Sequence, residues 1–460
     1  MIKVGGLPQE VKSSGTLRTA FLTLSLEAVF GGFYVSISRV VTPVFLVSQL
    51  GLDLPGLLAV NAFAGALSLG MSAILYRFLK RREHGIRWRL VAALTVERIL
   101  WFLIPFSASS IIPLTIVYGL AVASAVPSGI FLYSAFLSFF GEEPYRKLIA
   151  LRTIGTSIVS IIGQLTILTV LAFGEGLSKY ILLYVIAFSV GLISILLILI
   201  TPLQGVRITR PKEVAEESDI EAVNTFLLLI LLLTGTNLLS ISWVPRVLKD
   251  LGGPEYFPPL LALTQTLTAI AASVFWAGRK LRAHRAAFLL LSTVPPLIYL
   301  IPYLSIHIGI AALYGFALIG SNLYVSAAYW RVVKGLGVLK ASTLLTSGNS
   351  VALLIGSGLG YLISGWEAAV FLGSSLAIAS ALLIALLTLP ELALVPKHYS
   401  RLYSRILYNS SLAGYGLIVF TAEKTAKTSL KMTALLISLG ILYLIYRTIH
   451  YIIILSKGEG

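Results

Sequence analysis

Long apolar runs alternate with short polar stretches along the chain. Twelve of these runs precede Pro390, and each approaches or exceeds the roughly 20 residues that a helix needs to cross a bilayer. They cover residues 19–47, 54–75, 90–107, 111–139, 148–173 and 180–200 in the first half, and 225–248, 256–277, 286–303, 308–332, 341–363 and 368–389 in the second. The pattern predicts twelve transmembrane α-helices.

One long polar stretch divides these runs into two groups of six. Residues 204–224 contain three basic and five acidic side chains, and no other connection between apolar runs is as long and hydrophilic. We therefore predict a first bundle over residues 1–203, a cytoplasmic linker over 204–224 and a second bundle over 225–390.

Basic loops set the predicted orientation of the chain. The stretch 76–89 carries six Lys or Arg residues, and a similar basic loop returns at 276–285. Loops of membrane proteins that stay in the cytoplasm are enriched in Lys and Arg. The other even-numbered loops are also basic and the odd-numbered loops are not, which places the amino terminus and the end of the twelfth helix in the cytoplasm.

Two sequence patterns recur in the two halves. Ser36-Ile37-Ser38 matches Ser240-Ile241-Ser242, and a longer spaced pattern of small and polar residues also repeats. The second pattern is Thr153, Gly155, Ser157, Ile162 and Gly163, matched by Thr346, Gly348, Ser350, Ile355 and Gly356. Small residues could recur by chance, since they favour close helix contacts in membranes anyway. Together with the repeated basic loop, we interpret the matches as a six-plus-six duplication.

Composition supports a membrane protein and excludes several other classes. The chain is 57% hydrophobic and only 12% charged, which leaves too few polar residues to cover a soluble globule. A net charge of +16 would suggest nucleic acid in a soluble protein, but here the cations fall in short loops, where topology and anionic lipid headgroups explain them. The absence of cysteine excludes disulfides and Cys-based metal sites.

The segment 391–460 follows the twelfth predicted helix. Residues 397–408 carry basic and aromatic side chains at near-helical spacing, which suits a helix along the inner membrane surface. Residues 432–455 are apolar and long enough to span once more, although Arg447 and His450 interrupt them. We predict a thirteenth membrane helix there, with an interfacial helix as the alternative.

This architecture resembles the major facilitator superfamily over about residues 17–390. The basic loop after the second helix, with Arg77, Lys80, Arg81, Arg82, Gly85 and Arg87, is similar to that family's loop but lacks its Asp. Pro144-Tyr145-Arg146, followed by Gly155 and Gly163, is similar to the family's fourth loop and fifth helix. The resemblance implies an all-α bundle of two six-helix repeats, with helices one, four, seven and ten lining a central cavity.

Few ionisable residues lie at membrane depth, where each costs several kcal/mol unless it is paired or meets water. On the first predicted helix, Glu27 and Arg39 are twelve residues apart, about 18 Å along the axis, so they cannot pair with each other. Desolvation would raise the affinity of Glu27 for a proton, which makes it a candidate coupling residue. The alternatives are a permanent pair with a base such as Arg152, or a place at the wet cytoplasmic edge.

Arg39 is a candidate for binding an anionic substrate or a carboxylate, and its alternative is to reach the outer surface. On the third helix, Glu97 and Arg98 are adjacent, so we expect their side chains to point about 100° apart and to find separate neighbours. A salt bridge between helices or a proton site would account for them.

Neutral polar residues on the helices expected to line the cavity are further candidates for substrate contacts. They are Tyr118, Tyr133, Asn237, Trp243, Asn322 and Tyr324. In membrane helices such residues also serve as contacts between helices. We interpret Gln164, Gln265 and Asn349 in that second way, because they lie on helices less suited to face the cavity.

Enzyme chemistry finds no support in these residues. The five histidines, at positions 84, 284, 307, 398 and 450, are scattered over loops and the tail, where we expect them to be solvated rather than metal-bound. No catalytic dyad and no phosphate-binding loop is present. We therefore predict a monomeric, cofactor-free secondary transporter in the cell membrane that moves a small organic solute by alternating access, with protons as a candidate coupling ion. The alternative is a membrane scaffold or a lipid-modifying enzyme.

Overall fold

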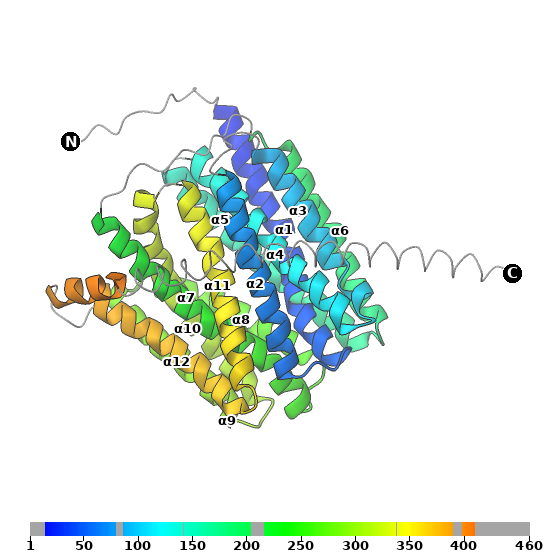
Figure 1. The fold of residues 1–460 in the computed structure, drawn as a ribbon. Coiled ribbons are helices and arrows are strands. Elements are labelled where there is room, and N and C mark those ends of the chain that lie inside the picture. The colour runs from blue at the N-terminus through cyan, green and yellow to red at the C-terminus, as the bar shows by residue number, and fades with distance from the viewer. Residues whose placement is uncertain are drawn as a thin grey trace.

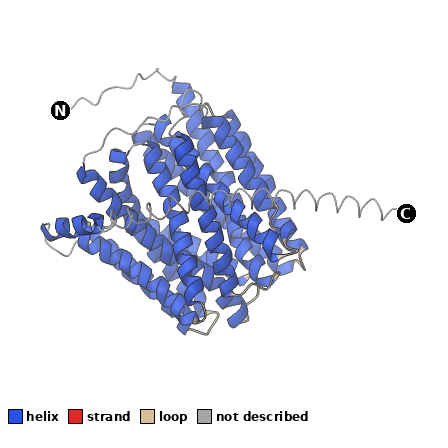
Figure 2. Cartoon of the chain, viewed as in Figure 1, coloured by secondary structure: helices blue, strands red, loops and turns tan. Residues whose placement is uncertain are grey.

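The computed structural model describes residues 14–79, 86–140, 142–203, 216–336, 338–389 and 398–409. Within these ranges the chain forms long helices and no strand (Figures 1 and 2). The first six helices are α1 (Ser14–Ser48), α2 (Leu54–Leu79), α3 (Ile86–Phe102), α4 (Ile111–Phe139), α5 (Glu142–Phe173) and α6 (Ser178–Ile200). The second six are α7 (Glu216–Pro245), α8 (Phe257–Ala277), α9 (His284–Leu300), α10 (Ile306–Leu336), α11 (Val338–Ile363) and α12 (Glu367–Thr388).

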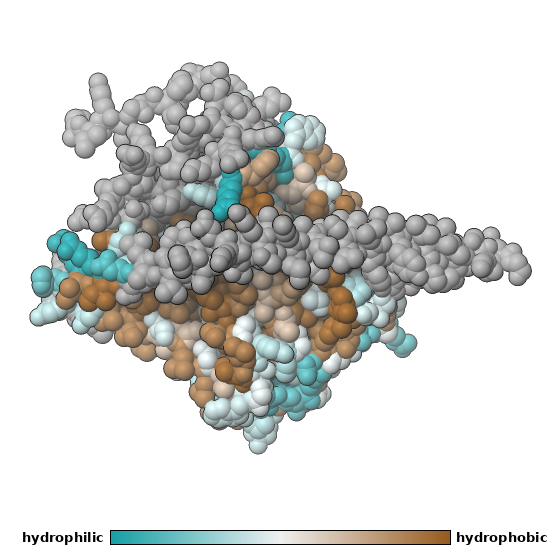
Figure 3. Space-filling model, viewed as in Figure 1, coloured by the Kyte–Doolittle hydropathy of each residue, from teal (hydrophilic) through white to brown (hydrophobic). Residues whose placement is uncertain are grey.

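The surface of this bundle is suited to lipid. In the described part of the chain, ten helical segments are long and apolar enough to cross a membrane. Large apolar side chains point outward, among them Val274 and Leu362, each 77% exposed. Figure 3 shows apolar residues over much of the described surface that is visible below the grey atoms, with polar residues gathered at its left and lower right edges. The protein is an all-α membrane bundle.

The predicted helices are confirmed, with two corrections at their ends. The predicted third helix, 90–107, ends at Phe102 in α3, and a short 3₁₀ turn over Pro105–Ser107 follows, because Pro105 has no backbone N–H to continue the helix. The helix predicted over 225–248 begins earlier, since α7 starts at Glu216, inside the predicted linker 204–224. The acidic sequence there suits a helix amino terminus, where negative charge is favoured.

The same pairs of helices contact each other in the two sets of six. In the first set, α1 packs on α5 and α6, while α4 packs on α2 and α3. In the second set, α7 packs on α11 and α12, while α10 packs on α8 and α9. The two sets therefore have matching internal arrangements, as a duplicated six-helix unit would.

The repeated glycines lie at matching close contacts. A Cβ on Gly163 of α5 would overlap with Ser36 Oγ of α1. A Cβ on Gly356 of α11 would lie 3.1 Å from the carbonyl oxygen of Thr234 in α7. The sequence match thus coincides with the places where the fifth and eleventh helices approach the first and seventh.

The two sets meet along two helix pairs, α2 with α11 and α5 with α8, and α4 also contacts α11. A very close approach occurs at Gly65 of α2, where a Cβ would lie 2.6 Å from the backbone nitrogen of Leu354 in α11. On the second pair, the Gln164 amide donates to Thr266 Oγ1 at 3.0 Å, as expected for a contact between helices. Both contacts lie away from the ends of their helices.

After α12, residues 398–409 form a helix, as the spacing of 397–408 predicts (Figure 1). The hydroxyl groups of Ser400 and Ser404 donate to the carbonyl oxygen of Thr388 at 3.2 and 3.3 Å, which ties this helix to the end of α12. The predicted thirteenth membrane helix, 432–455, lies outside the described residues.

Candidate functional site

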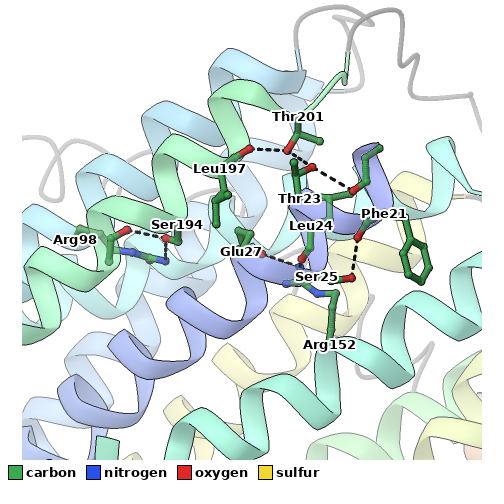
Figure 4. A network of polar contacts seen from close by, with 12 residues as sticks. Phe21, Thr23, Leu24, Ser25, Glu27, Arg98, Arg152, Ser194, Leu197 and Thr201 are labelled. Carbon is green, nitrogen blue, oxygen red and sulfur yellow. Dashed lines mark hydrogen bonds and ion pairs between the residues drawn. The ribbon is translucent and has the colours of Figure 1, made fainter. Parts of the chain in front are cut away.

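Two of the predicted candidates, Glu27 and Arg152, form an ion pair inside the first set. Arg152 of α5 donates from Nη1 to Glu27 Oε2 of α1 at 2.7 Å and also to the carbonyl oxygen of Leu24. Its guanidinium lies 4.6 Å from the centre of the Phe136 ring. Glu27 is only 3% exposed, so the pair is enclosed between helices (Figure 4).

Glu97 and Arg98 of α3 contact each other, contrary to the expectation that they point apart. Arg98 Nη1 lies 3.2 Å from Glu97 Oε1, because rotation about the long arginine side chain brings its end back to the neighbouring carboxylate. Arg98 also donates to Ser194 Oγ of α6 at 3.3 Å (Figure 4). Its guanidinium stacks over the Tyr34 ring of α1 at 4.1 Å. It therefore links three helices.

These two pairs are neighbours. Glu27 Oε1 and Arg98 Nη2 lie 3.1 and 3.7 Å from the point that a Cβ on Gly31 would occupy. Gly31 thus leaves the space in which the carboxylate and the guanidinium approach each other. Two acids and two arginines from three helices form one buried, electrically balanced group, which reduces the cost of placing charge at membrane depth.

Arg39 lies apart from this group. Its side chain is exposed, and in the described part of the chain it has neither an ion pair nor a side-chain hydrogen bond. Its charge nevertheless acts on the hydroxyl groups of Tyr118 in α4 and Tyr34 in α1, so it lies near both.

The neutral candidates take different places. Tyr118 is buried and donates to Asn61 Oδ1 of α2 at 2.8 Å, while Tyr133 is half-buried against Phe136. Asn237 of α7 donates to Asn349 Oδ1 of α11 at 3.4 Å, so the latter residue does connect helices. Asn322 is half-buried on α10.

Trp243 and Tyr324 belong to the core of the second set. The indole of Trp243 donates to His307 Nδ1 at 3.0 Å and packs edge-on against Tyr314. Tyr324 is fully buried and packs against Phe288 of α9, so it faces a neighbouring helix and not a cavity.

The prediction that the histidines are solvated is wrong for two of them. His307 is 0% exposed and His284 is 3% exposed. His307 is held between Trp243 and the carbonyl oxygen of Ile301, which its Nε2 reaches at 3.0 Å. His284 reaches the carbonyl oxygen of Gly320 at 2.6 Å. Backbone carbonyls satisfy these rings, and no pattern in the sequence points to such partners.

Polar contacts join the two sets at the predicted outer end of the bundle. Lys179 of α6 lies 2.5 Å from Glu255, just before α8, and the Tyr180 hydroxyl donates to the same carboxylate at 2.8 Å. Beside them, Lys249 donates to the carbonyl oxygen of Gly51 at 2.7 Å. We call Lys179, Tyr180, Glu255, Lys249 and Gly51 the outer contact. Sequence reasoning placed its charged residues in loops but had no signal that they would meet.

The acidic and histidine side chains are not gathered in the way that a metal ion needs. Among the described residues, no group of three or more His, Asp or Glu side chains is placed to hold such an ion. The buried acids Glu27 and Glu97 are each engaged by an arginine instead.

Comparison with solved structures identifies the fold. The chain aligns with a POT family transporter in complex with a thioalcohol-conjugated peptide at TM-score 0.62 and 14% identity, over 81% of this chain and 98% of that one. It aligns with the nucleoside transporter NupG at TM-score 0.56 and 15% identity, over 79% and 98%. A bacterial homolog of the human lysosomal transporter Spinster aligns at TM-score 0.52 and 14% identity, over 81% and 95%.

The sequence itself matches no protein-family profile and no curated protein. The relationship is visible in the arrangement of helices, which agrees over nearly the full length of each of these transporters. The chain is a multi-pass membrane protein with the fold of the major facilitator superfamily.

Proposed function

We propose that this protein is a secondary transporter that moves a small organic solute across the cell membrane by alternating access. The observation that carries the proposal is the contact between the two six-helix sets, which is concentrated in a few helix pairs and is polar at one end. Two bodies that share a narrow interface can rock against each other and expose a central site to either side in turn. The three aligned structures are all transporters.

The contacts between the sets suggest where such a movement turns and what it breaks. Gly65 against Leu354 and Gln164 against Thr266 lie away from the helix ends, where rocking displaces atoms least. The outer contact is farther from that axis. Opening towards the predicted outer side would therefore separate Lys179 from Glu255.

Proton coupling through Glu27 stays a prediction. The ion pair with Arg152 defines which contact would have to change for it. The Arg152 guanidinium engages the Glu27 carboxylate at 2.7 Å, so a coupling role for Glu27 requires that this contact open during transport. The two helices that carry the pair, α1 and α5, belong to the same set. If the set moves as a rigid body, the ion pair only stabilises the packing of α1 against α5. If α5 shifts against α1 during transport, the ion pair is the coupling site.

Flux measurements test both statements. Purified protein in proteoliposomes should accumulate a solute that stabilises it in a thermal-shift screen, since binding to the folded form raises its melting temperature. A coupling role predicts that Glu27→Gln abolishes accumulation driven by a pH gradient but preserves solute exchange. If Glu27→Gln lowers exchange, accumulation and the melting temperature together, the ion pair has a structural role and no coupling role. Absence of flux for every stabilising solute would contradict the transporter proposal.

A further inference from the structure

The balance of charge in the transmembrane helices singles out Arg39. Apart from Arg18 at the amino-terminal end of α1, three other arginines lie within or directly after these helices and away from the basic loops. Each has a carboxylate within 3.3 Å; they are Arg98, Arg152 and Arg246, paired with Glu97, Glu27 and Asp250. The carboxylates of Glu27 and Glu97 are thus already engaged. In the described part of the chain, no acidic side chain forms an ion pair with Arg39.

Arg39 lies inside the membrane-spanning segment Gly15–Ser48 and not at its end. It precedes the last helical residue, Ser48, by nine positions, which is about 14 Å at the helical rise. An arginine side chain spans about half of that distance, so Arg39 cannot place its charge beyond the end of the helix by extending along it. A guanidinium at this depth is strongly unfavourable unless water or an anion compensates its charge.

Arg39 lies on a different side of α1 from two apolar residues that point outward. The outward residues of α1, Leu22 and Leu26, are 50% and 47% exposed. At about 100° per residue they lie about 100° and 140° around the helix from Arg39. On its own side, Arg39 is near the Tyr118 hydroxyl of α4, which is held by Asn61 of α2. The exposed surface of Arg39 is therefore on the side of α1 towards Tyr118 and away from Leu22 and Leu26.

Helix α7, which contacts α1 from the other set, offers neutral groups. Ser240 on α7 is exposed. In the repeated pattern, the residue that corresponds to Arg39 is Trp243, which is buried against His307. Neither of these residues of the second set carries a carboxylate that could neutralise the arginine.

We propose that Arg39 binds the anionic group of the transported solute, which makes the substrate a small organic anion with a carboxylate or a phosphate. This inference rests on the proposed transport function. A guanidinium matches both anions with two parallel N–H donors, and a partner from outside the protein removes the cost of the unpaired charge. Arg39 then determines specificity for charge, while the neighbouring tyrosine and amide groups contact the rest of the solute.

The first test compares matched solutes in proteoliposomes. The panel contains succinate with succinamide, benzoate with benzamide, and glucose 6-phosphate with glucose. Transport of the anions is measured as charge movement after a concentration jump on a supported membrane. Transport of the neutral members is measured by uptake of radiolabel. We expect transport of at least one anion, and Arg39→Gln should lower its kcat/KM at least about 30-fold, which corresponds to the loss of about 2 kcal/mol that truncating one partner of a buried charge pair causes. Arg279→Gln, an exposed loop arginine, is the control and should match the unmodified protein.

The second test needs no substrate. The chain has no cysteine, so Arg39→Cys creates a single thiol. A thiol in a water-filled interior reacts with a charged, membrane-impermeant methanethiosulfonate reagent, whereas one in lipid reacts only with an apolar maleimide. We expect reaction with the charged reagent. Reaction with the apolar reagent alone would place residue 39 in lipid and overturn the proposal, whatever the flux data show.

The remaining outcomes separate this inference from the transport function. Transport of neutral members only, or anion transport that Arg39→Gln leaves unchanged, would overturn anion recognition by Arg39 and leave the transporter proposal intact. If no panel member is transported, binding measured by thermal shift decides: stabilisation by an anion that is lost in Arg39→Gln but kept in Arg279→Gln supports the site and counts against transport of that anion. No stabilisation by any anion would contradict the inference.

Discussion

At the residue scale, the stability of the first set depends on the buried group of Glu27, Arg152, Glu97 and Arg98, in which each charge is compensated by another. Removing one member of a buried ion pair leaves the other charge without compensation and lowers the free energy of unfolding by about 3–5 kcal/mol. Replacing both members with apolar residues costs less, because no buried charge is left unpaired. Arg152→Gln should therefore lower the melting temperature strongly, and the double variant Glu27→Gln/Arg152→Gln should recover part of the loss. Scanning fluorimetry in detergent measures both.

The matched control for this prediction is Arg279→Gln, which removes an exposed arginine at the loop before α9. It should shift the melting temperature little. Equal shifts in the Arg152 and Arg279 variants would show that the Glu27 carboxylate finds other compensation.

A second prediction at this scale concerns the buried His307. In Trp243→Phe, His307 Nδ1 would lose its hydrogen bond from the indole N–H. No water could replace that donor, because His307 is not exposed to solvent. An unsatisfied buried acceptor costs about 1–3 kcal/mol, so the variant should unfold at a lower temperature. Trp366→Phe changes a tryptophan that is 66% exposed and should have a much smaller effect. The same loss in both would argue that ring size, and not the hydrogen bond, matters.

At the element scale, the contact between α1 and α5 depends on the absence of a side chain at Gly163. The methyl group of an alanine there would overlap with Ser36 Oγ, so this hydroxyl must leave its hydrogen bond to the carbonyl oxygen of Phe33 or the two helices must separate. We expect Gly163→Ala to destabilise the protein by about 1–3 kcal/mol, as overpacking usually does. Gly70→Ala has no atom within 4 Å of the new methyl group and should instead be neutral or gain up to about 1 kcal/mol from helix propensity. Chemical denaturation of both variants checks the difference.

Most of the elements, but few of their side-chain contacts, could be predicted from the sequence. Helix positions follow from apolar length, because a membrane span needs a nearly fixed number of residues; α4 has the predicted bounds, Ile111–Phe139. The Glu27–Arg152 pair was foreseen as one of several options, since few bases lie at that depth. The partners of His307 and Lys179 come from distant segments, and no local pattern reports which of them meet.

The repeated residues were more informative than the charged ones. Gly163 and Gly356 were matched by spacing alone, and both lie at close contacts between equivalent helices. Close packing demands a small residue at a fixed place, so it leaves a pattern in each copy. Residues proposed to bind substrate differ between the copies, as Arg39 and Trp243 do, and a comparison of the halves cannot find them.

At the scale of the whole molecule, the outer contact should stabilise the conformation described here. Lys179→Glu replaces the attraction to Glu255 with repulsion, which is worth about 1 kcal/mol at a partly exposed site and shifts a two-state equilibrium several-fold. The charge-swapped double variant Lys179→Glu/Glu255→Lys should restore the original population. The population of the described conformation can be measured by the rate of limited proteolysis at the α5–α6 connection, or by the reactivity of a cysteine introduced there. A double variant that behaves like the single one would show that charge attraction is not what holds this end closed.

Alternating access requires that the two helix sets move against each other, and distances between spin labels measure that movement most directly. One label pair would be placed beside the outer contact, at Leu177→Cys and Tyr256→Cys, and the other at the predicted cytoplasmic end, at Trp88→Cys and Leu281→Cys; all four residues are exposed. In lipid nanodiscs, adding Lys179→Gln and Glu255→Gln should lengthen the outer distance and shorten the cytoplasmic one. Unchanged distances in both pairs, or a change of the same sign in both, would contradict alternating access.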